Sequence, residues 1–136
     1  MLLYMQKDIK TEGENEKMNK ADTYRLGEIE ARFADIVWEN APIRSKDLVT
    51  ICEKEIGWKR TTTYTVLKKF CNRGILKNEK AKVSVLIARD RFYAAKVQEF
   101  VDKSFGGSIV EFMKSYTFGK DVSDEDVKEI TKILKK

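Results

Sequence analysis

The sequence contains no histidine, and this absence removes several kinds of chemistry at once. Imidazole is the general base of Ser-His and Cys-His nucleophile pairs and a frequent metal ligand. The chain also lacks a glycine repeat that could cradle phosphates, since Gly106-Gly107 is only a pair. Neighbouring carboxylates such as Glu53 and Glu55 are ordinary on helix surfaces. The sequence therefore predicts no catalytic site, metal site or cofactor, and a protein that is not an enzyme.

Cysteine and long hydrophobic runs are also scarce. The two cysteines, Cys52 and Cys71, cannot form a disulfide framework, and both fall on apolar helical stripes. We interpret them as reduced, buried thiols, with a redox-sensing pair as the alternative. No apolar run approaches the roughly 18 to 20 residues that span a bilayer. These features predict a cytoplasmic protein that does not enter a membrane.

The length of 136 residues suits one domain, or one small domain with an appendage. Residues 1–23 are polar and charged without a helical period, which predicts a flexible leader. Met18 stands just before the first periodic segment, so we hypothesise that translation starts there. The rest of the chain is expected to divide into a first domain over residues 24–89 and a helical domain over residues 90–136.

Positive charge is concentrated in one stretch of the chain. Between Gly57 and Lys82, eight positions are Lys or Arg and only Glu79 is acidic, a local excess of seven, whereas the whole chain carries +5. Clustered positive charge beside an amphipathic helix is typical of phosphate binding. The alternative interpretation is a solvated charged face on an ordinary helix-and-hairpin domain.

Hydrophobic spacing predicts three short helices around this stretch. The first stops before Pro42, because proline disfavours helix in the residue that precedes it. The second runs from about Ser45 to Ile56 and the third from 60 to 73. The apolar face of the first helix comprises Leu26, Ile29, Phe33, Ile36 and Val37. The apolar face of the third comprises Thr63, Val66, Leu67, Phe70 and Cys71.

The other face of the third helix carries hydroxyls, an aromatic tip and cations, which bind phosphates and base edges. We expect two strands over residues 75–79 and 83–88, joined by a turn near Lys80 and Lys82. A tight helix pair followed by a basic hairpin is typical of a winged helix-turn-helix, so we expect a mainly α fold with a small β-wing. Tyr64 either contacts DNA or shields the wing. The predicted DNA-binding residues are Lys59, Arg60, Thr61, Thr62, Tyr64, Thr65, Lys68, Lys69, Lys80 and Lys82.

The tail beyond Ala88 predicts three more amphipathic helices. Asp90 is expected to cap the first and Ser123 the last, and Gly106-Gly107 interrupts them. Because this tail is short, it cannot enclose all of its own apolar faces. We therefore expect these faces to be buried against a second copy of the chain. The alternative is a monomer whose tail packs back onto the core. The predicted dimerisation residues are Tyr93, Val97, Phe100, Val101, Phe105, Ile109, Phe112, Met113, Ile130, Ile133 and Leu134.

Several segments resemble the penicillinase repressor family. They are LGEIEARFADIVW at 26–38, WKRTTTYTVLKKFCNRGIL at 58–76, the turn Phe105-Gly106-Gly107, and VSDEDVKEITKIL at 122–134. Many winged helices share the second segment, whereas the ordered combination is much more specific. The resemblance covers about residues 24–135.

The resemblance implies a homodimeric winged-helix repressor that binds inverted-repeat operators in double-stranded DNA and blocks transcription. It implies that Lys80 and Lys82 belong to the wing and that the tail from Phe92 onward dimerises. The residues that it places against the major groove are Thr61, Thr62, Thr65 and Lys68, with Lys59 and Arg60 at the start of the recognition helix.

Two departures from the family bear on the inducing signal. In β-lactam-responsive members a sensor protease cuts an Asn-Phe bond in the tail, and counting from Gly106-Gly107 places Ser115-Tyr116 there. Tyr116 is aromatic like the phenylalanine of those members, but Ser115 replaces the asparagine. This replacement argues against cleavage at that bond. Copper-responsive members carry a cysteine-rich end, and this chain has no cysteine after Cys71.

The function predicted from the sequence is therefore a homodimeric repressor that binds a palindromic operator through the major groove. The alternative is a winged-helix protein-interaction module that presents its basic helix to acidic partners. Promoter binding and oligomeric state separate these two functions.

Overall fold

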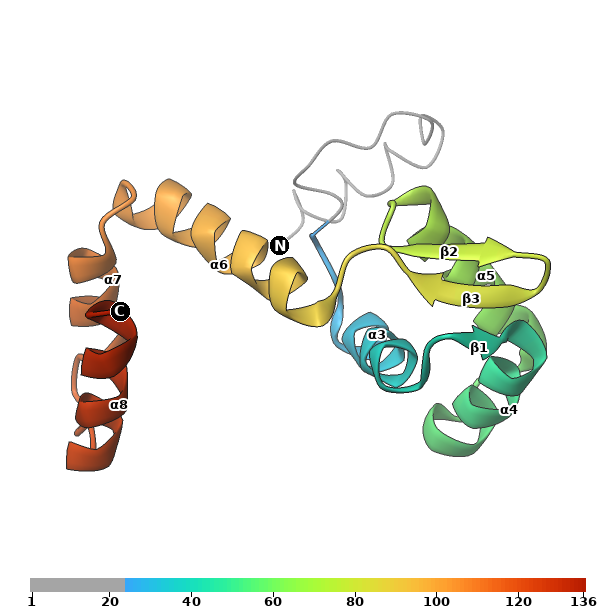
Figure 1. Cartoon of the computed structure of the whole chain (residues 1–136), viewed down its shortest axis with the longest axis horizontal. Coiled ribbons are helices and arrows are strands. Elements are labelled where there is room, and N and C mark those ends of the chain that lie inside the picture. The colour runs from blue at the N-terminus through green and yellow to red at the C-terminus, as the bar shows by residue number, and fades with distance from the viewer. Residues whose placement is uncertain (1–23) are drawn as a thin grey trace. The chain divides into compact units, whose positions relative to one another are not determined.

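The computed structural model describes residues 24–136, in six helices and three strands. The leader predicted over residues 1–23 and the proposed start at Met18 lie outside the described residues. The chain divides into two compact units, one that extends to Lys96 and one from Val97 to Lys136 (Figure 1). The division falls within a helix, α6 (Arg89–Phe105), rather than near its beginning, where the sequence placed a domain boundary.

Three helices form the body of the first unit: α3 (Glu28–Asn40), α4 (Ser45–Ile56) and α5 (Arg60–Asn72). The turn between α4 and α5 is short because Gly57 adopts a left-handed conformation, with φ of 66°. The Gly57 and Trp58 amides then donate to the carbonyls of Glu53 and Cys52. This tight connection confirms the helix-turn-helix predicted from the spacing of the apolar residues.

The core of the first unit lies between these helices and the sheet. Trp58 stacks on Phe33 at 5.5 Å between ring centroids, and Trp38 packs against Phe92 at 5.5 Å. Ile29 lies on the same face of α3 as Phe33, four residues on, but it is 43% exposed in the first turn of the helix. The largest fully buried side chains are Phe33, Phe70, Phe92, Leu48, Leu67, Ile75, Leu76, Val37 and Val83.

A small antiparallel sheet completes the first unit and contains one strand that the sequence did not predict. The strands β1 (Ile43–Arg44), β2 (Leu76–Glu79) and β3 (Lys82–Val85) lie in the order β1-β3-β2 (Figure 1). The hairpin of β2 and β3 is the predicted wing, with shorter strands than expected. β1 has only two residues, too few to show an alternating pattern.

The wing turn is built from two residues in the left-handed region. Lys80 has φ of 53° and Ala81 has φ of 60°, the combination that a two-residue hairpin turn of matching twist requires. Neither residue is the glycine or asparagine that usually fills such positions. The Ala81 carbonyl accepts a hydrogen bond of 2.9 Å from the Ser45 amide, which joins the wing tip to the start of α4.

The second unit consists of the end of α6 with α7 (Ile109–Tyr116) and α8 (Asp124–Leu134). Ser123 caps α8 by accepting from the Asp126 amide at 3.0 Å, as predicted, and Ser108 caps α7 in the same way. Asp90 is not a cap as predicted, because α6 begins one residue earlier and places it in the first turn. A ring cluster joins Phe100, Phe105, Phe112 and Tyr116.

Across residues 24–136, no helix is both long and apolar enough to pass through a membrane. Within the same range, no group of three or more acidic or cysteine side chains is arranged to hold a metal ion.

Candidate nucleic-acid interface

The recognition helix α5 has one buried face and one exposed face. Thr63, Leu67 and Phe70 recur at helical spacing and are buried against the core. The opposite face offers hydroxyl, amide and cationic groups to solvent, all of which bind phosphates or base edges. The exposed side chains of this face are Thr61, Thr62, Thr65, Lys68, Lys69 and Asn72.

The beginning of α5 favours an anion. The residue before the helix is Lys59, which is exposed and whose side chain forms no capping hydrogen bond. The first turn contains no acidic residue, and Arg60 adds a second cation. Unpaired backbone N–H groups and the helix dipole therefore point their positive ends toward the same place as these two side chains.

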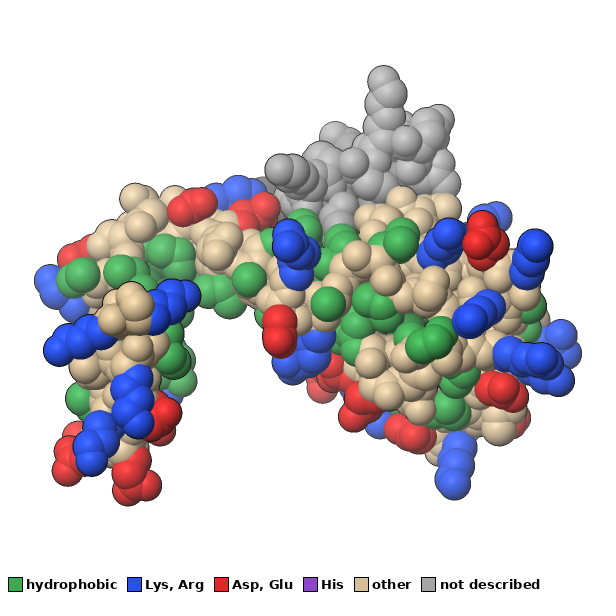
Figure 2. Space-filling model, in the orientation of Figure 1, with side chains coloured by type: hydrophobic (Ala, Val, Ile, Leu, Met, Phe, Trp, Pro, Cys, Tyr) green, Lys and Arg blue, Asp and Glu red, His purple; other side chains and the backbone are tan. Residues whose placement is uncertain are grey.

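The wing adds cations beside the helix. Figure 2 shows Lys and Arg side chains over the part of the first unit that carries the wing. Lys77 is paired with Glu79 at 3.3 Å, so this pair contributes little net charge. Lys80 and Lys82 are exposed, and neither forms an ion pair with any acidic side chain of residues 24–136.

Tyr64 differs from the exposed residues of α5 because its side chain is partly covered by neighbouring residues. Its ring is half-buried, with its hydroxyl 3.4 Å from Ser45 Oγ and the Arg60 guanidinium 5.6 Å from the ring centroid. It thus lies between the start of α4 and the recognition helix, facing the wing tip. The side chain covers this junction and is still partly exposed, so both roles considered from the sequence, DNA contact and shielding of the wing, stay predictions.

A groove of about 620 Å³ opens at this junction. Two of its cations, Arg44 and Lys46, were not predicted, because they reach the wing only through the pairing of β1 with β3. The signal that could have found them is the pair of cations on either side of the helix-starting Ser45. The groove is lined by Pro42, Ile43, Arg44, Ser45, Lys46, Tyr64, Lys80, Ala81 and Lys82.

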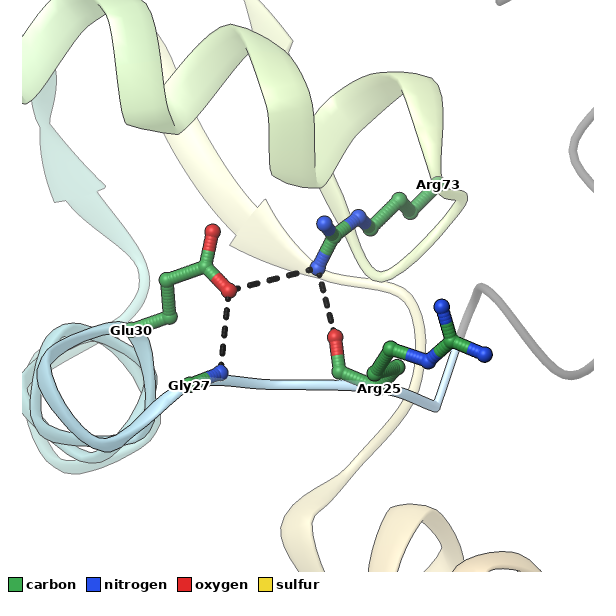
Figure 3. Close-up of polar contacts among 4 residues, drawn as sticks. All are labelled: Arg25, Gly27, Glu30 and Arg73. Carbon is green, nitrogen blue, oxygen red and sulfur yellow. Dashed lines mark hydrogen bonds and ion pairs between the residues drawn. The ribbon is translucent and has the colours of Figure 1, made fainter. Parts of the chain in front are cut away.

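Arg73, one of the cations of the basic stretch, is turned inward rather than toward a ligand. Its Nη1 donates to the Arg25 carbonyl at 2.9 Å and lies 3.8 Å from Glu30 Oε1 (Figure 3). The same carboxylate oxygen accepts from the Gly27 amide at 3.1 Å. Arg73 therefore joins the end of α5 to the start of α3.

Both cysteines lie in surroundings that disfavour the thiolate. Burial raises the pKa of the Cys52 thiol, and the nearby Thr63 hydroxyl opposes the rise only in part. Burial also raises the pKa of the Cys71 thiol, against a weaker effect of the Asn78 backbone. Because the thiolate is the reactive form, these environments support the structural interpretation of the cysteines. Rapid labelling of the native protein by a thiol reagent at pH 7 would contradict it.

Most of the predicted dimerisation residues lie in the second unit, where none of them is fully buried. Tyr93 is the exception, because it packs against Trp38 at 5.9 Å within the first unit. A groove of about 350 Å³ runs between α7 and α8 and is lined by Ile109, Val110, Met113, Lys114, Thr117, Ile130 and Leu134. Ser115 and Tyr116, the counterparts of a cleavage site in the family, are the last two residues of α7 and are exposed.

The fold and the exposed cationic helix agree with what comparison with known proteins finds. No individual curated protein matches the chain significantly. The family model described as penicillinase repressor matches residues 26–136, which is most of the chain and includes both units. The winged-helix arrangement of α3, α4, α5 and the sheet is the one expected for such a DNA-binding repressor. The chain therefore belongs to the penicillinase repressor family of transcriptional regulators.

Proposed function

We propose that the chain acts as a homodimeric repressor that binds a two-fold-symmetric operator through α5. The observation that carries this proposal is the exposed face of α5, where threonine hydroxyls and lysines stand beside a basic wing. Thr61, Thr62 and Thr65 offer hydroxyls to base edges and methyl groups to thymine. Lys68 and Lys69, both exposed, are proposed to meet the phosphates on either side.

Affinity for duplex DNA comes chiefly from the basic side chains. Each cation that meets a phosphate releases condensed counterions, so binding weakens as salt rises. Lys59, Arg60, Lys80 and Lys82 extend this contact from the start of α5 to the wing. The expected result is strong but salt-sensitive binding, with sequence preference supplied by the threonines.

Selectivity for an operator requires two copies. A dimer places its recognition helices in successive major grooves about 34 Å apart, so that only a symmetric site is matched on both sides. Binding to the second half-site is effectively intramolecular and multiplies affinity. The uncovered apolar residues of α6, α7 and α8, from Val97 to Leu134, support dimerisation through the second unit.

Release of DNA then requires loss of the dimer or a change in its spacing. A sensor protease would achieve this by cutting the tail, as in β-lactam-responsive members of the family. The bond between Ser115 and Tyr116 lies in the last turn of α7 and lacks the asparagine of those members. We therefore do not propose cleavage at this bond.

The test is binding of the full chain to promoter DNA from upstream of its own gene, with random duplex of equal length for comparison. Lys68→Ala is expected to weaken binding to both duplexes. Thr62→Ala and Thr65→Ala are expected to reduce the preference for the promoter more than the affinity for random DNA. Lys54→Ala, at an exposed position of α4, is the matched control. Equal losses on both duplexes for the threonine variants would show that they contact only the backbone.

A further inference from the structure

The groove between the start of α4 and the wing tip has an unusual charge distribution. Four of its nine lining residues are cations, Arg44, Lys46, Lys80 and Lys82, and none is acidic. All four are exposed, and among residues 24–136 no carboxylate forms an ion pair with any of them. The two acids adjacent to these cations in sequence, Asp47 and Glu79, do not line the groove.

The register of the sheet brings two of these cations together. Arg44 of β1 is directly opposite Lys82 of β3, so their side chains leave the same face of the sheet. Like charges directly opposite each other destabilise a sheet. Glu79 of β2 is the other neighbour of Lys82, but its carboxylate is paired with Lys77 at 3.3 Å. An anion between Arg44 and Lys82 would therefore relieve their repulsion.

The floor of the groove is held in place by two contacts. The Ser45 amide donates to the Ala81 carbonyl, which fixes the wing tip against α4. The Tyr64 hydroxyl lies 3.4 Å from the Ser45 side chain, which is itself buried. Lys80 and Ala81 adopt left-handed conformations to make this turn, and both residues line the groove.

We propose that this groove holds a phosphate of the DNA backbone, with Arg44 and Lys46 as binding residues beside Lys80 and Lys82. The proposal rests on DNA binding by α5 and extends the interface to a third element, the start of α4. The negative charge of the phosphate lies between Arg44 and Lys82 and relieves the repulsion between these two cations. Tyr64 and Ser45 are positioning residues, because their contact holds the recognition helix against the start of α4.

The experiment measures affinity of the full chain for promoter DNA and for random duplex over a range of salt concentrations. The double variant Arg44→Ala with Lys46→Ala is expected to reduce the salt slope by about one unit for each phosphate that is no longer neutralised. Affinity should fall by the same factor on both duplexes, because a phosphate contact carries no sequence information. The charge-preserving variant Arg44→Lys with Lys46→Arg should keep the wild-type slope.

Lys54→Ala, at the far end of α4, controls for the removal of charge alone and should leave the slope unchanged. If the wild type binds the promoter and the double variant keeps its slope, the groove is not a phosphate site although the proposed function stands. If the wild type binds neither duplex, the proposed function itself fails.

A second arm separates a backbone phosphate from a free one. Inorganic phosphate is titrated into the wild type without DNA, at constant ionic strength, and binding is followed by calorimetry. At an ionic strength of about 0.1 M, where the Debye length is about 10 Å, no measurable binding is expected for a site that only the duplex completes. Tight binding that is abolished in the double variant, with an unchanged DNA slope, would assign the groove to a free phosphate ligand and overturn the proposal.

Discussion

The two units of this chain use their apolar residues in opposite ways. In the first unit, Phe33, Val37, Leu48 and Phe70 are fully buried between three helices and a sheet. In the second, no residue of α7 or α8 is buried, although both helices have pronounced apolar stripes. Leu134 is 62% exposed and Phe118 is 87% exposed. One unit encloses its own core, whereas the other leaves its apolar surface uncovered.

This contrast separates two kinds of stability. A closed core stabilises the first unit within a single chain, independently of protein concentration. An uncovered apolar surface becomes stabilising only when something covers it, and in the proposed dimer a second copy of the same tail would do so. Stability of the tail should therefore depend on protein concentration, since obligate association links folding to mass action.

The largest expected effect is in the closed core. Phe70→Ala removes a fully buried ring that packs against Phe33 at 5.0 Å. We expect the free energy of unfolding to fall by about 3–5 kcal/mol, because removal of the ring leaves a cavity. Chemical denaturation followed by tryptophan fluorescence measures this change. A destabilisation that shrank as protein concentration rose would contradict the idea that this core is complete within one chain.

The second effect is on the tail. Ile109→Glu with Leu134→Glu places two charges in the apolar groove between α7 and α8. We expect monomers by light scattering and an affinity for the promoter that falls by at least about 100-fold, because a monomer occupies only one half-site. Lys128→Ala, at an exposed position of α8, is the control and should leave the dimer intact. A double variant that remains dimeric would remove this groove from the interface.

The third effect distinguishes structural from DNA-binding cations in the basic stretch. Arg73→Ala removes a charged hydrogen bond to the Arg25 carbonyl and the ion pair with Glu30. We expect a stability loss of about 1.5–3 kcal/mol with an unchanged salt slope for DNA binding. Lys69→Ala, exposed on the same helix, should show the reverse. A reduced salt slope for Arg73→Ala would show that its guanidinium meets phosphate instead.

The smallest effect is at the wing turn, where Ala81 has φ of 60°. Ala81→Gly relieves a left-handed conformation that costs an L-residue about 1–2 kcal/mol, and glycine loses more entropy on folding. We therefore expect a gain in stability of up to about 1 kcal/mol in thermal or chemical denaturation. A destabilised variant would mean that the turn is held without strain.

Much of the fold could be predicted because its signals are local. Gly57 ends α4, Pro42 follows the end of α3, and the spacing of Thr63, Leu67 and Phe70 defines the buried face of α5. The family resemblance agreed with this order of elements, whereas dimerisation through the tail stays a prediction. These predictions needed only neighbouring residues and a helical period.

The features that were missed depend on contacts between distant residues. The pairing of Arg44 with Lys82 joins segments that no local pattern connects. Arg73 counted as one more positive charge, and only the structure shows it turned toward Arg25 and Glu30. Phe92 was assigned to the tail with the rest of its helix, yet it is fully buried in the first unit.

The most direct test of the central claim is a hydroxyl-radical footprint of the full chain on promoter DNA from upstream of its own gene. The claim is that two copies of α5, joined through the second unit, read one symmetric site. It predicts two protected half-sites related by two-fold symmetry, with centres about 10 bp or a multiple of that apart. A single protected half-site, or none at concentrations where the protein is dimeric, would contradict it.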